Sequence, residues 1–393
     1  MFNKSFLSLS DLTHWIENRN FSGFDPYDAL NSDFILDKSK WIRILATTLF
    51  RFSPVNLRKI AGIGPGINAK AMGLLLSSYS KLNKFGIKKV DGRQSLIFEW
   101  LVKNRSKDFS GFSWGYNFPW QDVNRLLPRG APSIVTTAYV THGILDYYDS
   151  TKDPLALAAS KEACEFILKD LNIKNISDSL CFSYTPFEKN MVHNANVLGS
   201  SILARVYSYS NSSRLKDNST KSINFTVDRQ NSNGSWDYGI NPETQEPRIQ
   251  IDWHQGFILD SLLDYIKYIE PSDPKYYDSL IKGAEYYKNN QFMGGGRCKW
   301  RGDTIWPVDV HNQAQAIITF TKLSEYNLKY LEFACKVADW TIDNLRDNSG
   351  FFYFQKWPLF TNKIPYMRWS QSWMMLALTL LNIKKIRYKN ELS

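Results

Sequence analysis

Three histidines stand at the same place in three similar segments, where their side chains could carry proton chemistry. His193, His254 and His311 each open a long run of mostly apolar residues, and Asp252 and Asp309 precede the last two by two positions. Imidazole titrates near neutral pH, so it can accept and return a proton within one reaction. The aspartates either cap helices at these points or take part in the same chemistry. We therefore expect these side chains to meet at one shared site.

The starts of the apolar runs repeat along the chain with a nearly constant spacing. They fall at Asn68, Thr136, His193, His254, His311 and Ser370, so the steps are 68, 57, 61, 57 and 59 residues. About 60 residues is the length of two helices of about 15–18 residues with two connections. Segments 276–290 and 330–345 lie between the later starts and carry apolar residues every three or four positions. Buried runs that alternate with amphipathic ones indicate an inner and an outer ring of helices.

The repeat predicts an all-α fold, an (α/α)6 toroid or barrel of helical hairpins with short aromatic turns. We expect a single toroid domain over residues 36–393, preceded by an N-terminal extension of residues 1–35. The aromatic turns lie ahead of the inner helices at 111–116, 181–184, 234–239, 298–300 and 350–354. Aromatic rings pack cores, and they also stack on ligands. The candidate ligand-binding residues in these turns are Trp114, Tyr116, Trp236, Asp237, Tyr238 and Trp300.

One of the turns contains the segment Gln230-Asn-Ser-Asn-Gly234-Ser-Trp236. It resembles the Q-x3-G-x-W motif of terpenoid cyclases, and the period over roughly residues 36–386 looks like their six-hairpin toroid. That superfold also hosts prenyltransferase β-subunits, glycosidases, polysaccharide lyases and uronate epimerases. The DxDD and DDxxD signatures of terpene cyclases are missing, and no Cys/His/Asp zinc set can be assigned. An isoprenoid activity is therefore not favoured, and we expect neither a metal nor a cofactor.

Three short segments near the N-terminus form a further pattern. They are Trp15-Ile-Glu, Phe-Asp-Pro-Tyr-Asp-Ala-Leu-Asn at 24–31 and Ser-Pro-Val-Asn-Leu-Arg at 53–58. Together they resemble a bacterial family found among surface-polysaccharide biosynthesis proteins. Some members carry a delta-aminolevulinic acid dehydratase label, but that enzyme is a TIM barrel, and this chain has no alternating strand and helix pattern. The resemblance implies a place in O-antigen or capsule biosynthesis and supplies no catalytic residues.

Polar side chains follow the starts of the inner helices. The amides are Asn194, Gln255, Asn312 and Gln371. Each amide offers a donor and an acceptor, which suits a hydroxyl-rich ligand as well as ordinary helix capping. Arg368 precedes the last start, and its guanidinium could bind a carboxylate or a phosphate through two hydrogen bonds. Tyr139, close to the start of the second inner helix, and Tyr238 are candidate partners of the histidines in acid and base catalysis.

The charge balance limits the partners that this chain can have. The net charge is +10, which attracts anionic molecules, but no nucleic-acid motif and no dense Lys/Arg run is present. The four cysteines form no CxxC pair, which is typical of a reducing compartment. No signal-peptide core and no apolar run of about 18 residues occurs in the sequence. We expect a cytoplasmic protein, peripheral to the inner membrane, with no nucleic-acid partner.

The segment Ser39–Lys59 mixes large apolar residues with Arg43, Arg51, Arg58 and Lys59. It is expected either to be the outer helix of the first hairpin or to lie as a basic amphipathic helix on an anionic membrane surface. The two interpretations are compatible. The expected partners are therefore a saccharide or lipid-linked saccharide and an anionic membrane surface.

These observations favour a carbohydrate-active enzyme of bacterial surface-polysaccharide biosynthesis. The hypothesis is proton abstraction and return at a sugar carbon, of the epimerase or lyase type, with His254 and His311 as acid and base and Arg368 binding a substrate carboxylate. One alternative is a glycoside hydrolase that uses a pair of carboxylates from among Asp237, Asp252 and Asp309. The other alternative is a non-catalytic protein that binds a saccharide at the membrane surface.

Overall fold

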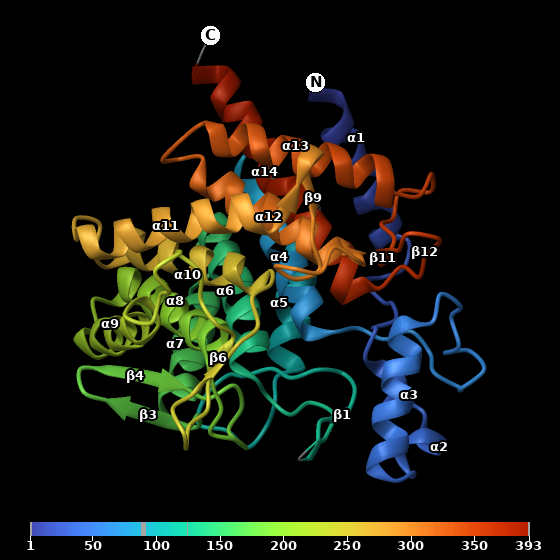
Figure 1. The fold of residues 1–393 in the computed structure, drawn as a ribbon, viewed down its shortest axis with the longest axis horizontal. Helices are drawn as coiled ribbons and strands as arrows, with labels where there is room; N and C mark the ends of the chain where they lie inside the picture. The colour runs from blue at the N-terminus through green and yellow to red at the C-terminus, as the bar shows by residue number, and fades with distance from the viewer. Residues whose placement is uncertain (1, 88–91, 124, 392–393) are drawn as a thin grey trace.

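The inner ring of helices closes on itself. The computed structural model describes residues 2–87, 92–123 and 125–391. Within these residues the inner helices are α4 (Ala69–Lys84), α6 (Ile134–Thr151), α8 (His193–Ser210), α10 (His254–Tyr268), α12 (Val310–Leu323) and α14 (Ser372–Glu391). Each contacts the next in chain order, and α14 returns to α4 (Figure 1). The predicted (α/α)6 toroid is confirmed, and each expected start lies within two residues of an observed helix start.

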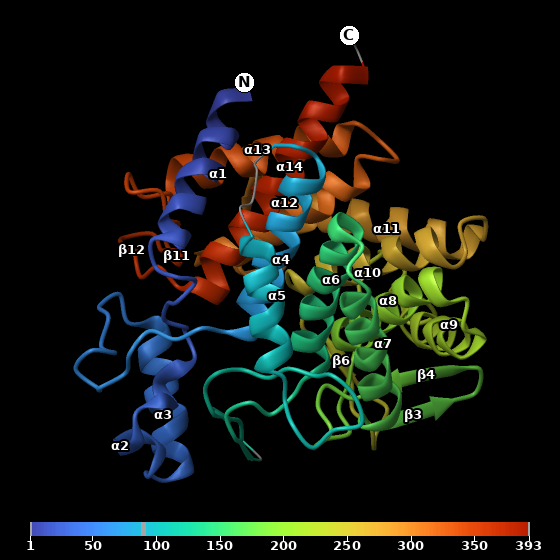
Figure 2. The same cartoon turned by 180° about the vertical axis from the view of Figure 1, so that it is seen from behind.

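The outer helices lie on the inner ring, each one packed against the inner helix before it. They are α5 (Arg93–Lys103), α7 (Pro154–Lys169), α9 (Ser213–Val227), α11 (Pro274–Asn290) and α13 (Lys329–Leu345). The helix α1 (Phe2–Glu17) packs against α14 and α13, as the view from behind shows (Figure 2). Part of the segment before residue 36 thus forms a helix that packs on the ring. The domain boundary at that residue stays a prediction.

Inner helices approach one another closely where small residues face each other. A Cβ atom added to Gly143 would lie 2.2 Å from the carbonyl oxygen of Gly73, and one added to Gly73 would lie 2.6 Å from the Cα of Val140. No side chain fits at such distances, so the glycines set the spacing between α4 and α6. The inner helices are buried nearly all round, which explains their weak apolar and polar alternation in the sequence.

The two faces of the ring differ in the length of their loops. On one face, short turns such as Lys152–Asp153 lead from an inner helix to its outer partner. On the other face, long segments lead from each outer helix to the next inner helix and carry short antiparallel strands. These are β1 (Trp120–Gln121), β2 (Leu126–Leu127), β3 (Ile173–Ile176), β4 (Ser179–Phe182), β5 (Met191–Val192), β6 (Gly239–Ile240), β7 (Pro247–Arg248), β8 (Phe292–Met293), β9 (Arg297–Cys298), β10 (Val308–Asp309), β11 (Gln355–Lys356) and β12 (Thr361–Asn362). The inner helices therefore begin at the long-loop face, which we call the mouth.

Short helical turns complete the structure near the mouth. They are the 3-10 helices η1 (Asp28–Asn31) and η2 (Gly294–Gly296), the π-helix η3 (Met367–Gln371) and the four-residue helix α2 (Asp33–Leu36). The π-helix η3 runs directly into α14 and is fully buried. Helices with this wider winding occur often at functional sites.

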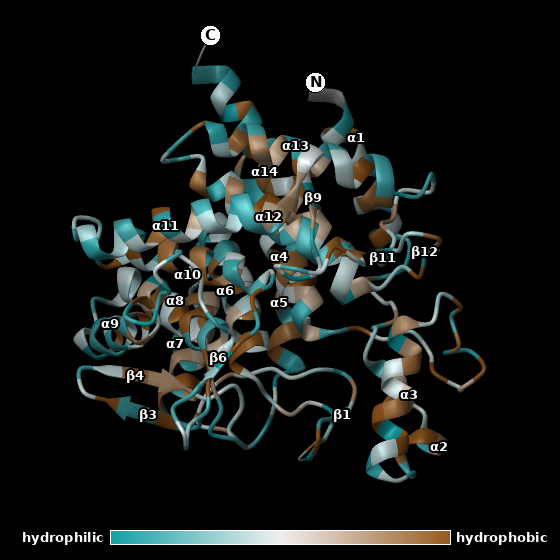
Figure 3. Cartoon of the chain, in the orientation of Figure 1, coloured by the Kyte–Doolittle hydropathy of each residue, from teal (hydrophilic) through white to brown (hydrophobic). Residues whose placement is uncertain are grey.

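The helix α3 (Lys40–Phe52) stands apart from both rings. It contacts η1, α2 and β1, while α5 occupies the outer position of the first hairpin, so the expectation of an outer helix over 39–59 is wrong. The buried ion pair between Arg58 and Asp28, 2.6 Å long, anchors the segment that follows α3. Hydrophobic residues occur along α3 (Figure 3), and its large apolar side chains Trp41, Ile42, Leu45, Leu49 and Phe52 are exposed. No helix in the described ranges is long and apolar enough to cross a bilayer.

Candidate functional site

An aspartate orients the imidazole of His254 at the mouth. The carboxylate of Asp252 accepts hydrogen bonds from the backbone N–H of His254 (3.0 Å), from its ring Nδ1 (2.5 Å) and from Nε2 of Gln250 (2.6 Å). Burial alone would raise the pKa of Asp252, but the neighbouring His254 and these hydrogen bonds lower it. Since Nδ1 is committed to the carboxylate, Nε2 carries the free lone pair, and the side chain is 20% exposed.

His311 lies deeper and is enclosed by aromatic rings. Its ring centroid is 4.4 Å from that of Trp373, 4.6 Å from Trp369 and 5.9 Å from Phe257. Burial, followed by the positive charges of Lys70 and Arg368, holds the pKa of His311 well below its usual range, so the ring is neutral at pH 7. Neither ring nitrogen has a hydrogen-bond partner among the described residues. A buried polar group without a partner is unusual in native proteins, so both nitrogens of His311 are free to take part in a hydrogen bond.

The structure brings His254 and His311 together but not His193. The rings of His254 and His311 both contact Phe257, at 5.6 and 5.9 Å. His193 instead turns between α8 and α9, where Nδ1 lies 3.2 Å from the hydroxyl of Thr226 and the ring lies 5.3 Å from that of Phe225. Burial lowers the pKa of His193 to about 3, so its ring is uncharged.

Arg368 already holds a carboxylate of the protein itself. Its Nε and Nη2 atoms donate to the two carboxylate oxygens of Asp25 at 2.5 and 2.7 Å, and both side chains are buried. The guanidinium also lies 4.7 Å from the ring centroid of Tyr116. The fork geometry expected for a bound carboxylate is therefore present, with Asp25 in the ligand's place.

A layer of aromatic rings crosses the ring axis below the histidines. Tyr139 contacts Trp373 at 4.9 Å and Phe257 at 6.1 Å between centroids. The ammonium of Lys70 lies over Tyr139 (4.6 Å) and Trp373 (5.2 Å) and forms no ion pair within the described ranges. Burial and then Arg368 hold the pKa of Lys70 well below its ordinary value, and burial raises that of Tyr139 well above its own. These two groups form the floor of the histidine site.

The amides at the helix starts take two different roles. Gln255 accepts from the backbone N–H of Trp236 (2.9 Å) and donates to its carbonyl (2.7 Å), and Gln371 makes the same pair of bonds with Phe352 (2.8 and 2.7 Å). These side chains clamp the aromatic turns onto the inner helices. The side-chain oxygens of Asn194 and Asn312, in contrast, are buried and have no partner among the described residues.

A comparable clamp recurs in the other hairpins that have aromatic turns. Gln313 accepts from the backbone N–H of Cys298 at 2.7 Å, and Asn196 accepts from that of Phe182 at 2.9 Å. The hydroxyl of Thr137 accepts from the backbone N–H of Trp114 at 3.2 Å. The residue that binds the turn thus varies in type and in offset from the helix start, which hides the pattern in the sequence.

The aromatic turns also divide into packing and site residues. Trp114 and Trp236 are fully buried, and their indole N–H groups donate to the carbonyls of Leu101 (2.8 Å) and Thr226 (2.9 Å). The ring of Tyr238 instead lies 5.1 Å from that of His254. Of these three predicted rings, those of Trp114 and Trp236 pack the turns, and that of Tyr238 lies beside His254.

The remaining predicted turn residues lie at the edge of this group. Trp300 packs against Trp253 at 5.2 Å, and Trp253 in turn stacks on His254. Asp309 is buried completely, and its carboxylate accepts hydrogen bonds from the backbone N–H of His311, from Nε2 of Gln355 on β11 and from Nε1 of Trp369 in η3. Asp237 is half-buried in the turn after Trp236.

Sequence reasoning missed two charged residues of the site. Lys70 had a visible signal, a cation near the start of an otherwise apolar inner helix. Asp25 had none, because it reaches Arg368 from 343 positions away. No three His, Cys, Asp or Glu side chains in the described part of the chain gather in a way that could hold a metal ion. The site can move protons through His254, with the neutral His311 and Lys70 beside it.

The fold is shared with solved structures of sugar-acting proteins. A cellobiose 2-epimerase from Bacillus thermoamylovorans is 14% identical, with a TM-score of 0.66 over 81% of this chain and 88% of that one. A family 76 α-mannanase from Bacteroides thetaiotaomicron is 13% identical, with a TM-score of 0.61 over 82% and 88%. A D-mannose isomerase is 11% identical, with a TM-score of 0.62 over 81% and 87%. At such identities the likeness shows the toroid fold alone.

No protein-family model and no curated protein matches the sequence. The resemblance of the N-terminal segments to surface-polysaccharide proteins therefore stays a prediction.

Proposed function

We propose that the protein is a carbohydrate-active enzyme that removes and returns a proton at a sugar carbon, as an epimerase or lyase does. The observation that carries the proposal is the Asp252–His254 pair, which leaves Nε2 of a partly exposed imidazole as the proton acceptor. The solved structures that share the fold include proteins named cellobiose 2-epimerase and D-mannose isomerase, which supports a sugar as the substrate.

In this proposal His254 takes the proton from a carbon next to a carbonyl or carboxylate. The electron pair of the broken C–H bond moves onto the carbonyl oxygen. The ammonium of Lys70, at the floor of the site, would stabilise the negative charge that develops there. For an epimer, a proton from solvent is added at the opposite face and His254 releases its own proton to solvent. For a lyase, the proton on His254 passes to the leaving oxygen on the adjacent carbon, and an unsaturated sugar remains. His311, Tyr238 and the unpaired amide oxygens of Asn194 and Asn312 are the proposed substrate contacts.

The carboxylate-pair alternative is not favoured by the geometry. Asp252 and Asp309 are fully buried, and their oxygens already accept hydrogen bonds from helix starts and neighbouring side chains. A glycosidase needs two carboxyl groups that face the same bond, about 5–10 Å apart.

The test is hydrogen exchange from D₂O into candidate sugars and uronate oligosaccharides, followed by NMR and mass spectrometry. Deuterium at a carbon without chain cleavage identifies an epimerase, and a new end that absorbs in the ultraviolet identifies a lyase. His254→Gln should abolish either reaction, while His14→Gln, a change of an exposed histidine, should leave it intact. Saccharide binding without turnover, unaltered in affinity by His254→Gln, would instead identify a binding protein.

We further propose that the protein works at an anionic membrane surface on a lipid-linked saccharide of surface-polysaccharide biosynthesis. The support is α3, whose large apolar side chains are exposed and whose sequence neighbourhood carries Lys38, Lys40 and Lys59. Vesicles of phosphatidylglycerol should pellet the protein, whereas vesicles of phosphatidylcholine should not. Leu45→Lys/Leu49→Lys should weaken this binding by at least about tenfold, because each leucine contributes roughly 1.5–3 kcal/mol on burial.

The matched control for the membrane proposal is Leu155→Lys, since Leu155 is an exposed leucine of α7 outside the α3 face. Its binding to vesicles should equal that of the unchanged protein. Equal binding by the α3 double variant, or no binding to anionic vesicles at all, would refute the membrane proposal and leave the sugar chemistry untouched.

A further inference from the structure

A cavity lies on the ring axis at the face opposite the mouth. Its volume is about 320 Å³, and its lining comes from the inner helices or the residues that directly follow them. Tyr139 and Trp373 belong to this lining and also contact Phe257 and the ammonium of Lys70. The aromatic layer therefore separates this space, which we call the axial cavity, from the histidine site.

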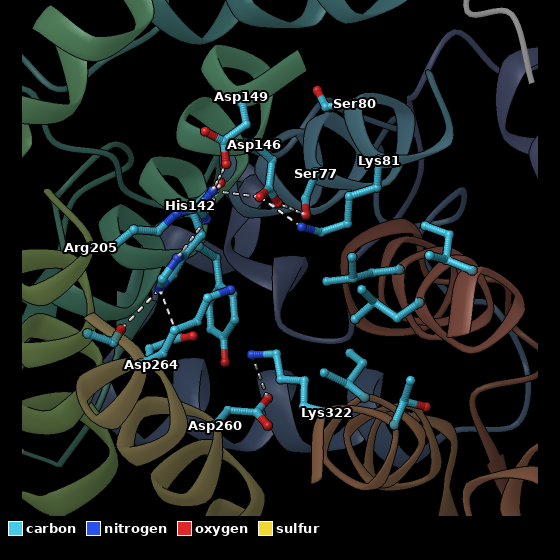
Figure 4. A pocket seen from close by; sticks show the side chains of 18 of the residues that line it. Ser77, Ser80, Lys81, His142, Asp146, Asp149, Arg205, Asp260, Asp264 and Lys322 are labelled. Atoms are coloured by element: carbon cyan, nitrogen blue, oxygen red, sulfur yellow. Dashed lines mark hydrogen bonds and ion pairs between the residues drawn. The ribbon is translucent and has the colours of Figure 1, made fainter. Parts of the chain in front are cut away.

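One wall of the axial cavity is built from buried charges. Asp146 is held at 2.8 Å by Lys81 and at 2.7 Å by Arg205, which also reaches Asp149 at 3.1 Å (Figure 4). Burial opposes ionisation of Asp146, but Lys81 and Arg205 lower its pKa far below the usual range. The charges are fixed in place before any ligand arrives, which favours binding.

The facing side of the cavity carries a second charged group. Lys322 lies 3.7 Å from Asp260, and His142 lies 3.7 Å from Asp264, whose side chain points into the same space (Figure 4). Burial lowers the pKa of His142 to about 4, so it is a neutral hydrogen-bonding group here. Both sides of the cavity thus present polar atoms to its centre.

Several polar atoms of this lining have no hydrogen-bond partner among the described residues. They are Oγ of Ser80, Oγ1 of Thr321, Oδ1 of Asp260 and Nε of Arg205. The first two side chains are 0% and 5% exposed, so they are as buried as core residues. Native proteins rarely leave such atoms unpaired, and a ligand with several hydroxyl groups would pair them.

The part of α14 that precedes its basic end forms an apolar wall. Leu376, Leu380 and Ile383 line the cavity and are spaced by four and three residues, so they share one face of that helix. A pyranose ring presents C–H groups on one side and hydroxyl groups around its edge, which fits one apolar and one polar wall. The volume lies at the small end of the range for ligand pockets, about 300–1,000 Å³, and suits a single sugar unit.

The outer end of the axial cavity is positively charged. Seven Lys or Arg side chains line the cavity against five Asp or Glu. Three of them, Lys84, Lys267 and Arg387, are exposed and form no ion pair within the described ranges. Inner helices end at this face while outer helices begin there, so their dipoles largely cancel. The excess charge is therefore available to an anion.

We propose that the axial cavity is a second ligand site that binds an anionic monosaccharide, a sugar with one phosphate or carboxylate group. The sugar hydroxyls pair with Thr321 and Asp260, and the sugar ring rests on the apolar face of α14. The anionic group lies at the outer end between Lys267 and Arg387. This site is separate from the proposed chemistry at His254.

Isothermal titration calorimetry at low salt tests the proposal with glucose 6-phosphate, glucuronate, glucose and inorganic phosphate. The two anionic sugars should bind. Glucose, which lacks the anionic group, and phosphate, which lacks the sugar, should each bind at least about tenfold more weakly. Lys267→Glu/Arg387→Glu should weaken the anionic sugars by at least about tenfold. The control Lys161→Glu/Lys221→Glu, with the same charge change at exposed positions of α7 and α9, should bind like the unchanged protein.

Two further variants test whether the ligand binds inside the axial cavity, and not at the histidine site or only through charges on the surface. Thr321→Val, which keeps the side-chain shape, should weaken both anionic sugars by about threefold to tenfold. His254→Gln should leave their binding unchanged, whether or not the protein proves to be an epimerase or lyase. Failure of both anionic sugars to bind, phosphate binding as tight as that of glucose 6-phosphate, or loss of binding in His254→Gln would each overturn the proposal.

Discussion

Asp252 determines which nitrogen of His254 can act as a base. Because Nδ1 donates to the carboxylate, the lone pair resides on Nε2. In Asp252→Asn the amide can present its N–H group to Nδ1, which favours the other tautomer and places the proton on Nε2. We expect the rate of proton exchange into the substrate to fall about 10²–10⁴-fold with little change in sugar affinity.

The control for this prediction is Gln250→Ala, which removes a neighbour of Asp252 but keeps the carboxylate and the imidazole paired. Its exchange rate should stay within about tenfold of the unchanged protein. An Asp252→Asn variant that exchanges deuterium as fast as Gln250→Ala would show that His254 needs no orientation by the carboxylate.

His193 makes stability depend on pH although its ring lies between α8 and α9 and not beside His254 and His311. Its pKa is about 3 in the folded protein, first because of burial and then because of Arg229, against about 6.5 in an unfolded chain. The unfolded chain therefore binds the extra proton, so stability is fully present above pH 6.5 and is lost as the pH falls toward 3. Each pH unit in this window costs up to about 1.4 kcal/mol.

We expect His193→Asn to lose less stability than the unchanged protein when the pH falls from 6.5 to 5, by about 2 kcal/mol. Urea unfolding at the two pH values measures this difference. His14→Asn, at an exposed histidine of α1, should retain the full pH dependence. A pH dependence unchanged in His193→Asn would mean that this imidazole is charged in the folded protein.

At the scale of the elements, the clamps between turns and inner helices explain why the site is built on rigid parts. Gln255 satisfies both backbone groups of Trp236, a residue that is fully buried. Gln255→Leu would leave a buried donor and a buried acceptor unpaired, so we expect a loss of about 2–5 kcal/mol in the free energy of unfolding. Asn194→Ala, which removes an amide whose oxygen is unpaired, should cost less than about 1 kcal/mol.

Chemical denaturation distinguishes this clamp from a role in ligand binding. A stable Gln255→Leu protein with weakened saccharide affinity would indicate that the amide contacts the ligand. The same measurement on Gln371→Leu should give a similar loss of stability, because Gln371 makes the equivalent two bonds to Phe352.

The histidine pattern shows how far the sequence carries the prediction of the site. Aligned segments place His193, His254 and His311 together, and His193 and His254 are each the first residue of an inner helix, α8 and α10. Their rings nevertheless take different partners, because Nδ1 of His254 is held by Asp252 whereas Nδ1 of His193 lies beside Thr226 of α9. The repeat therefore predicts the helix starts well, while the direction of each side chain depends on contacts with neighbouring elements that the repeat does not specify.

At the scale of the whole molecule, the sixfold period predicts the ring but not its closure. The period arises from local helix lengths, which are encoded within each segment of about 60 residues. Ring closure instead brings α14 back to α4, and α1 from the N-terminal part of the chain packs on α14. Ser5 on α1 donates to the side chain of Asn382 on α14 at 2.7 Å and accepts from Lys385 at 3.2 Å, across more than 370 positions. A contact between residues so far apart in the sequence cannot be predicted from a local pattern.

The helix α1 should therefore determine whether the ring unfolds as one unit. Leu12 and Ile16 are fully buried, whereas Phe6 and Leu7 on the same helix are 41% and 53% exposed. We expect Leu12→Ala/Ile16→Ala to lower the free energy of unfolding by about 4–8 kcal/mol. Phe6→Ala/Leu7→Ala should cost less than about 1 kcal/mol. Urea denaturation monitored by tryptophan fluorescence compares the two pairs, and equal small losses would mean that the ring holds without α1.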